Sequence, residues 1–354
     1  MTKIIFLTRL FYPHIGGVEK HVWEISKRLL EEGNEVTIIT EEFSVDQGMR
    51  KMDRYTGFNF TGKHEKLKIL HVPVGRTDWF KKFRIWKWMW KNRQIIGEYD
   101  IIHCHDIFFW YLPFRFIFPK KRVFITFHGY EMEYPLIKKA VIVRKIGELL
   151  SFGNICVGEY LKKWYKTKPT YIIYGGIEKN SKEIEIKPLE KQIIKIAFVG
   201  RLENDTGLPL YISCLKLLKK KKIKYAFNIY GDGKLINQAK KYGISHGFIK
   251  DVNKAIIDND IIFASSYLSV LESLNNKKFV CSVYNNPLKK DILEMTPFSK
   301  WIQITDNPEV LTNQVVDYIQ NQKKYSSLLE EEYEWVRTQT WENIVLIYKK
   351  LWKA

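Results

Sequence analysis

Short apolar runs alternate with amphipathic stretches almost from the first residue of the chain. Residues 3–8 (KIIFLT) predict a strand, and residues 18–33 predict a helix whose apolar positions recur at helical spacing until Gly33. Later compact runs are VTIIT (36–40), LKILHV (67–72), YDIIHCH (99–105) and RVFITFH (122–128). Strands that alternate with helices predict parallel βαβ units and a doubly wound α/β sheet.

The pattern restarts in the second half of the chain. After a polar, charged segment at 179–192, the run IIKIAFVGRL (193–202) predicts a new first strand, and helices and strands again alternate. The 354 residues fit two domains. We therefore predict two Rossmann-like domains, 1–178 and 179–340, and a final helix, 341–354, that crosses back to the first. Ligands of such sheets bind at the carboxyl ends of strands, so we expect the active site in the cleft between the domains.

Composition narrows the class of protein. Hydrophobic residues make up 45% of the chain, enough for two cores. The N-terminus reads as a strand without a signal-peptide cleavage site, and the longest apolar stretch, 107–118, is too short to span a bilayer. The four cysteines form no C-x-x-C pair, so we expect a cytoplasmic protein without a metal or redox centre. The net charge of +19 favours a polyanionic partner, or reflects a Lys-rich surface alone.

Two sets of strand ends in the first half are candidate sites. Gly16 and Gly17 open a helix directly after the first strand, where backbone N–H groups favour an anion. By itself a Gly-Gly turn is weak evidence, and a tight connection between strand and helix explains it better. The absence of G-x-G-x-x-G argues against a dinucleotide dehydrogenase. His105 and Asp106 end one strand and His128 ends the next; a zinc cluster is the competing interpretation, but the partner spacing for it is missing.

The second half offers three further turns. Arg201 follows a buried strand, as a phosphate-binding arginine would, and Gly231 and Gly233 would allow close approach of the backbone to a ligand. The turn ASSYLSVLESL (264–274) leads into a helix, so that amides near its start can hold a diphosphate. Glu272 can accept hydrogen bonds from ribose hydroxyls or serve only as a helix-dipole carboxylate. The candidate amides are those of Leu268, Ser269, Val270 and Leu271.

In this order, over nearly the whole chain, these motifs resemble the family 4 glycosyltransferases, the large retaining class with the GT-B fold. The resemblance implies that Gly16 and Gly17 lie against the donor diphosphate and sugar, and that His128 is the cleft histidine important for catalysis. It implies that Arg201 contacts the donor phosphates and Glu272 the donor ribose. The family needs no divalent metal, so the resemblance implies that DND at 258–260 is the lead-in to a buried strand. His105 and Asp106 are then expected in the acceptor cleft.

The chain departs from the family at two positions. The lysine usually found five residues after the arginine is Thr206 here, and the glutamate usually found eight residues before Glu272 is Ala264. Fewer cationic contacts would weaken stabilisation of the leaving group. Lys234 or Lys250 could hold the donor instead, or activity is reduced. A non-catalytic GT-B partner or scaffold subunit, and a GT-B sugar-nucleotide epimerase, are the alternatives.

The segment WFKKFRIWKWMWKNR (79–93) combines six basic residues, six aromatic residues and no acid. On a helical wheel four of the aromatic residues share one narrow face, and three basic residues lie about a quarter-turn away, which suits a helix at an anionic membrane surface. Core packing is the main alternative. Neither half resembles a nucleic-acid-binding module, so we expect no nucleic-acid partner. The predicted membrane-contact residues are Trp79, Phe83, Arg84, Trp86, Lys87, Trp90 and Lys91.

Together, these features predict a retaining, metal-independent glycosyltransferase without a cofactor. The second domain is expected to bind a nucleotide sugar, and the first a lipid-linked or oligosaccharide acceptor at the cytoplasmic face of a membrane. No carboxylate pair like that of glycosidases is evident. The front-face mechanism usually proposed for the family, in which the donor phosphate helps to deprotonate the acceptor, is consistent with this.

Overall fold

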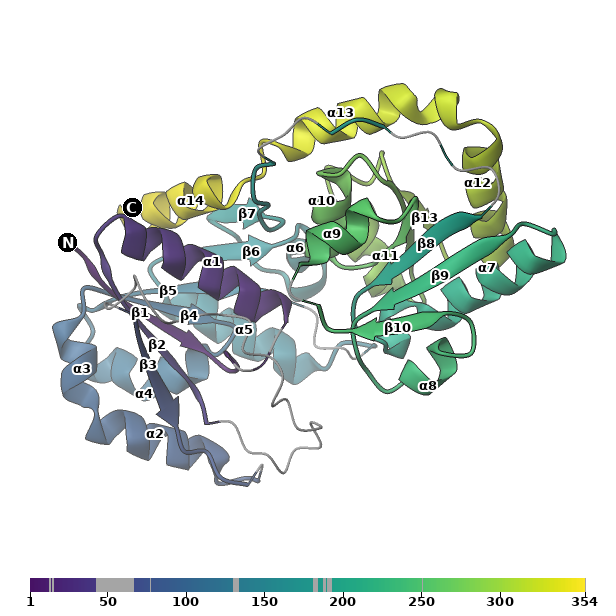
Figure 1. Ribbon diagram of the computed structural model, residues 1–354. Helices are drawn as coiled ribbons and strands as arrows, with labels where there is room; N and C mark the ends of the chain where they lie inside the picture. Colours follow the sequence, from purple (N-terminus) through teal and green to yellow (C-terminus); the bar gives the residue numbers. More distant parts are fainter. Residues whose placement is uncertain are drawn as a thin grey trace. The chain divides into compact units, whose positions relative to one another are not determined.

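The chain folds into two units, each built around a parallel sheet (Figure 1). The first unit comprises residues 1–173 and 341–354, and the second residues 174–340. The boundary thus lies at Tyr174, slightly before the expected Lys179, and the last helix belongs to the first unit. This computed structural model describes residues 1–12, 14, 16–42, 67–76, 78–129, 134–180, 184–186, 189, 193–249 and 251–353.

In the described residues, the sheet of the first unit has seven parallel strands in the order β3-β2-β1-β4-β5-β6-β7. The order reverses between β1 and β4, which makes their carboxyl ends the topological switch point where ligands of such sheets bind. The register pairs Thr8 of β1 with His105 of β4, and His105 with Thr126 of β5, so the residues that follow these strands emerge at one edge. The strands are β1 (Lys3–Thr8), β2 (Glu35–Glu41), β3 (Leu67–Val72), β4 (Ile101–His105), β5 (Arg122–Phe127), β6 (Asn154–Val157) and β7 (Tyr171–Ile173).

Helix α1 (Gly17–Glu31) shows why the sequence pattern predicted this unit well. Val22, Ile25 and Leu29 are buried, and the helix ends before Gly33, whose φ of 84° is the left-handed backbone that commonly follows a helix. The purple α1 and the yellow α14 (Trp341–Lys353) pack side by side (Figure 1). The other helices are α2 (Lys81–Lys91), α3 (Arg93–Glu98), α4 (Phe108–Ile117), α5 (Lys138–Leu150) and α6 (Tyr160–Tyr165).

The second unit repeats the plan with six parallel strands in the order β10-β9-β8-β11-β12-β13, counted in the described residues. Its switch point lies between β8 and β11, whose buried residues pack on both faces of the sheet. The strands are β8 (Ile194–Val199), β9 (Tyr225–Tyr230), β10 (Ile244–Gly247), β11 (Ile261–Phe263), β12 (Phe279–Val283) and β13 (Gln303–Thr305). The α-helices are α7 (Leu208–Lys220), α8 (Ile236–Ala239), α9 (Val252–Ile257), α10 (Tyr267–Leu274), α11 (Pro287–Glu294), α12 (Pro308–Gln320) and α13 (Ser326–Val336).

Candidate functional site

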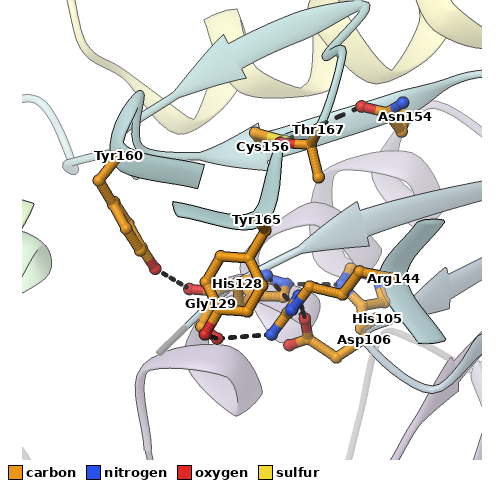
Figure 2. Close-up of polar contacts among 10 residues, drawn as sticks. All are labelled: His105, Asp106, His128, Gly129, Arg144, Asn154, Cys156, Tyr160, Tyr165 and Thr167. Carbon is orange, nitrogen blue, oxygen red and sulfur yellow. Dashed lines mark hydrogen bonds and ion pairs between the residues drawn. The ribbon is translucent and has the colours of Figure 1, made fainter. Parts of the chain in front are cut away.

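Polar side chains gather at the carboxyl ends of β4 and β5 in the first unit (Figure 2). Asp106 follows β4 in a left-handed conformation, with φ = 62°. Its carboxylate accepts a hydrogen bond from the backbone N–H of His128, with Oδ1 at 3.0 Å. Nδ1 of His105 and Nε2 of His128 lie 2.9 Å apart. The structure therefore brings together three residues that the sequence placed at the ends of neighbouring strands.

A buried arginine from α5 fixes this arrangement, and nothing in the sequence singled it out. Arg144 donates from Nη1 to Oδ1 of Asp106 at 3.0 Å and from Nη2 to the carbonyl of Gly129 at 2.5 Å (Figure 2). Its guanidinium carbon lies 4.4 Å from the centre of the Tyr165 ring. Charge-assisted hydrogen bonds of this kind hold geometry firmly. The Asp106 carboxylate is thus engaged in positioning the turn after β5.

The turn after β5 is too tightly packed to carry a larger residue. Gly129 has φ = 109°, and a β-carbon there would overlap the hydroxyl group of Tyr160. That hydroxyl lies 3.5 Å from the carbonyl oxygen of His128, to which it can donate a hydrogen bond. Both contacts restrict the backbone on either side of the His128 side chain.

Three histidines, one from α1 and two from β4, pack together with His128, which follows β5. The ring centres of His21 and His128 lie 4.9 Å apart, and those of His105 and His128 lie 5.2 Å apart. Burial is the larger cause, and the nearby Arg144 guanidinium the smaller one, that together lower the pKa of His128 to about 3. Burial also lowers the pKa of His21, His103 and His105, with smaller effects from their histidine neighbours. All four rings are therefore neutral at neutral pH.

The environment of His105 indicates which His128 nitrogen carries the proton. Nε2 of His105 is buried and has no hydrogen-bond partner among the described residues. A proton there would be an unpaired donor, so we place it on Nδ1, from which it is donated to Nε2 of His128. His128 then carries its own proton on Nδ1. His105 is only 1% exposed, so it supports His128 and does not line an acceptor surface as expected.

Helix α14 closes another side of the histidine cluster. The Tyr348 hydroxyl lies 2.9 Å from Nε2 of His21 and 2.8 Å from Oγ1 of Thr126. Nε1 of Trp352 donates to Nδ1 of His103 at 3.0 Å. The final helix therefore satisfies polar groups deep in the first unit, a role that its sequence did not reveal.

The Gly16–Gly17 turn, expected to lie against the donor diphosphate, has an acidic side chain beside it, that of Glu19 in the first turn of α1. Gly16 is the N-cap of α1, and a β-carbon on it would overlap the carboxylate of Glu19. The Glu19 carboxylate also contacts Nδ1 of His14 at 2.9 Å. A diphosphate at this turn would meet that carboxylate, so the turn alone is a poor anion site.

In the second unit, Arg201 follows β8 at the switch point. Its side chain is half exposed, and Nη2 donates to Oδ2 of Asp205 at 2.7 Å. The hydroxyl of Thr206 lies 2.7 Å from the carbonyl oxygen of Arg201 and 2.8 Å from that of Glu203. Thr206 therefore stabilises the turn that carries Arg201, and supplies no cation to it.

The two glycines expected to face a ligand instead contact the protein's own backbone. A β-carbon on Gly231 would overlap the carbonyl oxygen of Gly200, and one on Gly233 would overlap that of Leu202. Their small size thus permits the loop after β9 to pack against the loop after β8. Backbone packing thus accounts for glycine at both positions, and a contact of Gly231 with the donor stays a prediction.

The start of α10 remains a candidate anion site, but a narrower one than expected. Ser266 is the N-cap, and the Val270 amide already donates to the Ser266 carbonyl at 3.0 Å. The amides of Val270 and Leu271 thus belong to the helix ladder, which leaves the amides of the first three helical residues to face a ligand. Leu268 and Ser269 are among these three. Glu272 is half-buried in the second turn of α10.

A buried lysine lies at the same switch point. In α11, Lys289 donates from Nζ to the carbonyl oxygen of Ser265 at 2.7 Å. Burial lowers the pKa of Lys289 to about 8; Asp205 opposes this shift and Arg201 adds to it. Lys234 is exposed, and Lys250 lies outside the described residues. Ala264, where the family usually has a glutamate, is fully buried.

The DND sequence is confirmed as the lead-in to a buried strand. Nδ2 of Asn259 donates to the carbonyl of Ala255 at 2.7 Å, and Oδ2 of Asp260 accepts from the Lys195 amide at 2.8 Å. The buried strand β11 follows directly. Within the described residues, no group of three or more His, Cys, Asp or Glu side chains is arranged to hold a metal ion.

Helices α2, α4 and α5 expose apolar and basic side chains on the first unit. In α2, Ile85 and Met89 are buried, whereas Phe83, Lys87, Trp90 and Lys91 are exposed. The sequence analysis did not identify the exposed apolar residues of α4 and α5: Phe116 of α4 is 71% exposed and Leu149 of α5 is 79% exposed. Exposed large apolar residues on these three helices and directly beside them include Trp79, Phe80, Phe83, Trp90, Phe116, Ile117, Ile142, Val143, Ile146, Leu149 and Phe152, here called the apolar surface.

Two of the expected membrane-contact residues are instead engaged with the protein. Nε1 of Trp86 donates to the carbonyl of Phe109 at 2.8 Å, which ties α2 to α4. Arg84 donates to the carbonyl of Val74 at 2.7 Å and pairs with Asp78 at 2.8 Å.

None of the helices in the described part of the chain has the length and apolar character needed to cross a membrane.

Comparisons with known proteins bear on this architecture. Residues 15–180 match the family model described as Glycosyltransferase Family 4. An uncharacterised glycosyltransferase of Methanocaldococcus jannaschii is 24% identical, with 99% of this chain and 98% of that protein covered. The phosphatidylinositol N-acetylglucosaminyltransferase gpi3 subunit of Schizosaccharomyces pombe is 20% identical, with 92% of this chain and 76% of that protein covered.

Solved structures match over nearly the full length. A glycosyltransferase from Rickettsia africae has a TM-score of 0.69 at 16% identity and covers 99% of this chain and 98% of its own. WaaG, a glycosyltransferase involved in lipopolysaccharide biosynthesis, has a TM-score of 0.65 at 14% identity, with coverages of 97% and 99%. A mutant of TarM from S. aureus, in complex with fondaparinux, α-GlcNAc-glycerol and UDP, has a TM-score of 0.68 at 12% identity, with both chains fully covered. These likenesses confirm the α/β fold with two Rossmann-like units.

Proposed function

Because the chain is a glycosyltransferase of the family 4 type with the GT-B fold, we propose that it transfers a sugar, with retention and without a metal ion, from a nucleotide sugar to a lipid-linked or glycan acceptor. The second unit holds the donor. Arg201 and the first amides of α10 flank the β8/β11 switch point, where they stabilise the negative charge of the departing diphosphate. The half-buried Glu272 accepts hydrogen bonds from the donor ribose.

In this proposal His128 acts at the reacting sugar. The single observation that supports this role is that Asp106, His105 and the hydrogen bonds of Arg144 hold His128 in position. A neutral ring with its proton on Nδ1 donates a hydrogen bond and adds no charge. The donor phosphate, and not an enzyme carboxylate, deprotonates the acceptor, because the Asp106 carboxylate is already engaged by Arg144.

We place the reaction at the cytoplasmic face of a membrane, where the protein is attached peripherally. The apolar surface, with exposed Lys87 and Lys91 beside it, suits contact with anionic headgroups. The names of two similar proteins, a phosphatidylinositol N-acetylglucosaminyltransferase subunit and a glycosyltransferase involved in lipopolysaccharide biosynthesis, support an acceptor of lipid character. Arg84 and Trp86 are left out of this contact because the protein itself engages them.

The alternative is a partner subunit that retains the fold without turnover, which the Thr206 and Ala264 departures favour. Release of free sugar or its transfer from a panel of UDP-, GDP- and ADP-sugars separates the two. We expect Arg201→Ala and His128→Ala each to lower turnover by about 100-fold or more, as for removal of one charge-stabilising donor. Lys220→Ala, which removes an exposed cation of α7 in the second unit, is the matched control. Turnover unchanged in both site variants would refute the assigned site, and no turnover in the wild type would favour the subunit.

A further inference from the structure

Lys289 is a buried cation at the edge of the sheet where the donor is expected. Its side chain belongs to α11, and the residue is 7% exposed. Nζ donates to the carbonyl of Ser265, the residue between the buried Ala264 and Ser266, the N-cap of α10. The ammonium group is therefore fixed beside the first turn of the helix whose amides face the switch point.

The charges around Lys289 leave the site positive. Arg201 and Asp205 both act on Lys289 electrostatically, and these two residues pair with each other at 2.7 Å. Two cations and one carboxylate carry a net charge of one positive unit. The hydroxyl of Thr206 is directed to backbone carbonyls of its own turn, so that turn adds no second cation to Arg201.

We propose that Lys289 contacts the diphosphate of the nucleotide donor and supplies the second cation beside Arg201. The inference rests on the proposed function and names a donor contact that the sequence motifs did not include. When a diphosphate enters, the ammonium exchanges the Ser265 carbonyl for a phosphate oxygen, which is a stronger, charge-assisted acceptor. Asp205 stays paired with Arg201 and limits the charge of the empty site.

Binding should then be linked to proton uptake. With its pKa lowered to about 8, Lys289 is partly neutral at that pH, while Arg201 stays charged. A phosphate anion in contact favours the protonated amine, so the complex takes up a fraction of a proton from the buffer. Asp205, Arg201 and the Ser265 carbonyl are the groups that act on this amine from the neighbouring turns.

Isothermal titration calorimetry near pH 8 tests the proposal on the full chain. UDP, GDP and ADP are titrated separately, and the tightest binder is measured in two buffers that differ in ionisation enthalpy. We expect Lys289→Met to weaken binding by about 10- to 100-fold, the loss of one charged hydrogen bond, and to abolish proton uptake. Lys289→Arg should retain more affinity but take up no proton, because a guanidinium stays charged. Lys290→Met, at the half-exposed neighbouring position where the lysine pairs with Glu294, should match the wild type in both quantities.

The outcomes separate this inference from the proposed function. A wild type that binds none of the three diphosphates overturns the donor assignment and this contact with it. A wild type that binds, with Lys289→Met equal to Lys290→Met in affinity and proton uptake, overturns the Lys289 contact alone. Thermal unfolding shows whether Lys289→Met is folded. If it is not folded, the proton uptake of Lys289→Arg on binding decides whether Lys289 contacts the diphosphate. Uptake by Lys289→Arg equal to that of the wild type overturns the contact.

Discussion

The buried histidines of the first unit link its stability to pH. Burial lowers the pKa of His21, His103 and His105, and burial together with Arg144 lowers that of His128 to about 3. Between that value and about 6.5 the unfolded chain binds more protons than the folded one, so stability is full above pH 6.5 and falls on acidification. The loss is at most about 1.4 kcal/mol per histidine and pH unit.

Urea unfolding at pH 7 and pH 5.5, followed by hydrogen exchange in peptides from β4 and β5, measures this dependence. We expect a lower free energy of unfolding at pH 5.5, and a shallower dependence in His21→Gln, which has one titrating ring fewer. Equal free energies at the two pH values in the wild type would contradict the assignment.

The carboxylic acid of Glu332 in the second unit links stability to pH in the opposite direction. Glu332 of α13 is fully buried, and neither carboxylate oxygen has a hydrogen-bond partner among the described residues. Burial raises its pKa well above the usual value. The folded state therefore binds the extra proton, so the contribution of this group to stability is present at low pH and is lost as pH rises through the raised pKa.

Glu332→Met should stabilise the second unit at pH 8 by on the order of 1–3 kcal/mol, because it removes a buried polar group without partners. The gain should shrink at pH 5, where the acid is neutral. Urea unfolding of both variants at the two pH values measures it, with Glu331→Met, at an exposed position paired with Lys300, as the control. An unchanged or lower stability of Glu332→Met at pH 8 would rule out an unpaired acid.

At the scale of single elements, the periodicity of apolar residues predicted those strands and helices whose bounds depend on local sequence alone. LKILHV is β3 with the expected bounds, and the run at 3–8 is β1. The apolar face of α1 and its Gly33 stop were also predicted, because both follow from spacing within one element. Helix α5 was not predicted at all: it leaves Ile142, Ile146 and Leu149 exposed, so its pattern does not look like that of a helix packed on a core.

The candidate site shows the same limit. Asp106 and His128 were predicted because they directly follow strong strand signals. Arg144 and Lys289 were not, because each reaches its partners from a helix whose position depends on tertiary packing. Gly231 was assigned to a ligand because sequence cannot tell whether a small residue makes room for a ligand or for backbone.

Helix α14 provides a test at the element scale. Leu351 is fully buried and its side chain lies where a β-carbon on Gly153 would be, whereas Leu346 on the same helix is 51% exposed. We expect Leu351→Ala to lower the free energy of unfolding of the first unit by about 2–5 kcal/mol, and Leu346→Ala to change it by less than about 0.5 kcal/mol. Urea unfolding, monitored by hydrogen exchange in α1 and β4, compares the two. Similar effects of both variants would mean that α14 does not pack as described.

At the scale of the whole molecule, the contributions of charge and of exposed apolar area to membrane attachment should differ in their response to salt. The chain carries a net charge of +19, and Lys87 and Lys91 are exposed beside the aromatic residues of α2. Attraction of a basic residue to anionic lipid contributes about 1 kcal/mol and is screened as salt rises. Burial of the apolar surface in the headgroup region is not screened in this way. Attachment should therefore have a salt-sensitive part and a salt-resistant part.

Flotation with phosphatidylserine-containing vesicles at about 0.1 M and about 1 M salt measures both parts. Lys87→Glu with Lys91→Glu should reduce binding mainly at low salt, because it reverses two exposed charges. Ile142→Ser with Leu149→Ser, and separately Trp79→Ser with Trp90→Ser, should reduce the binding that persists at high salt. Ile244→Ser, at an exposed apolar position of the second unit, is the matched control and should float like the wild type. If the variant with Ile142→Ser and Leu149→Ser floats as well as this control at both salt concentrations, α5 does not enter the headgroup region. If the wild type binds neutral and anionic vesicles equally, the basic residues do not direct attachment.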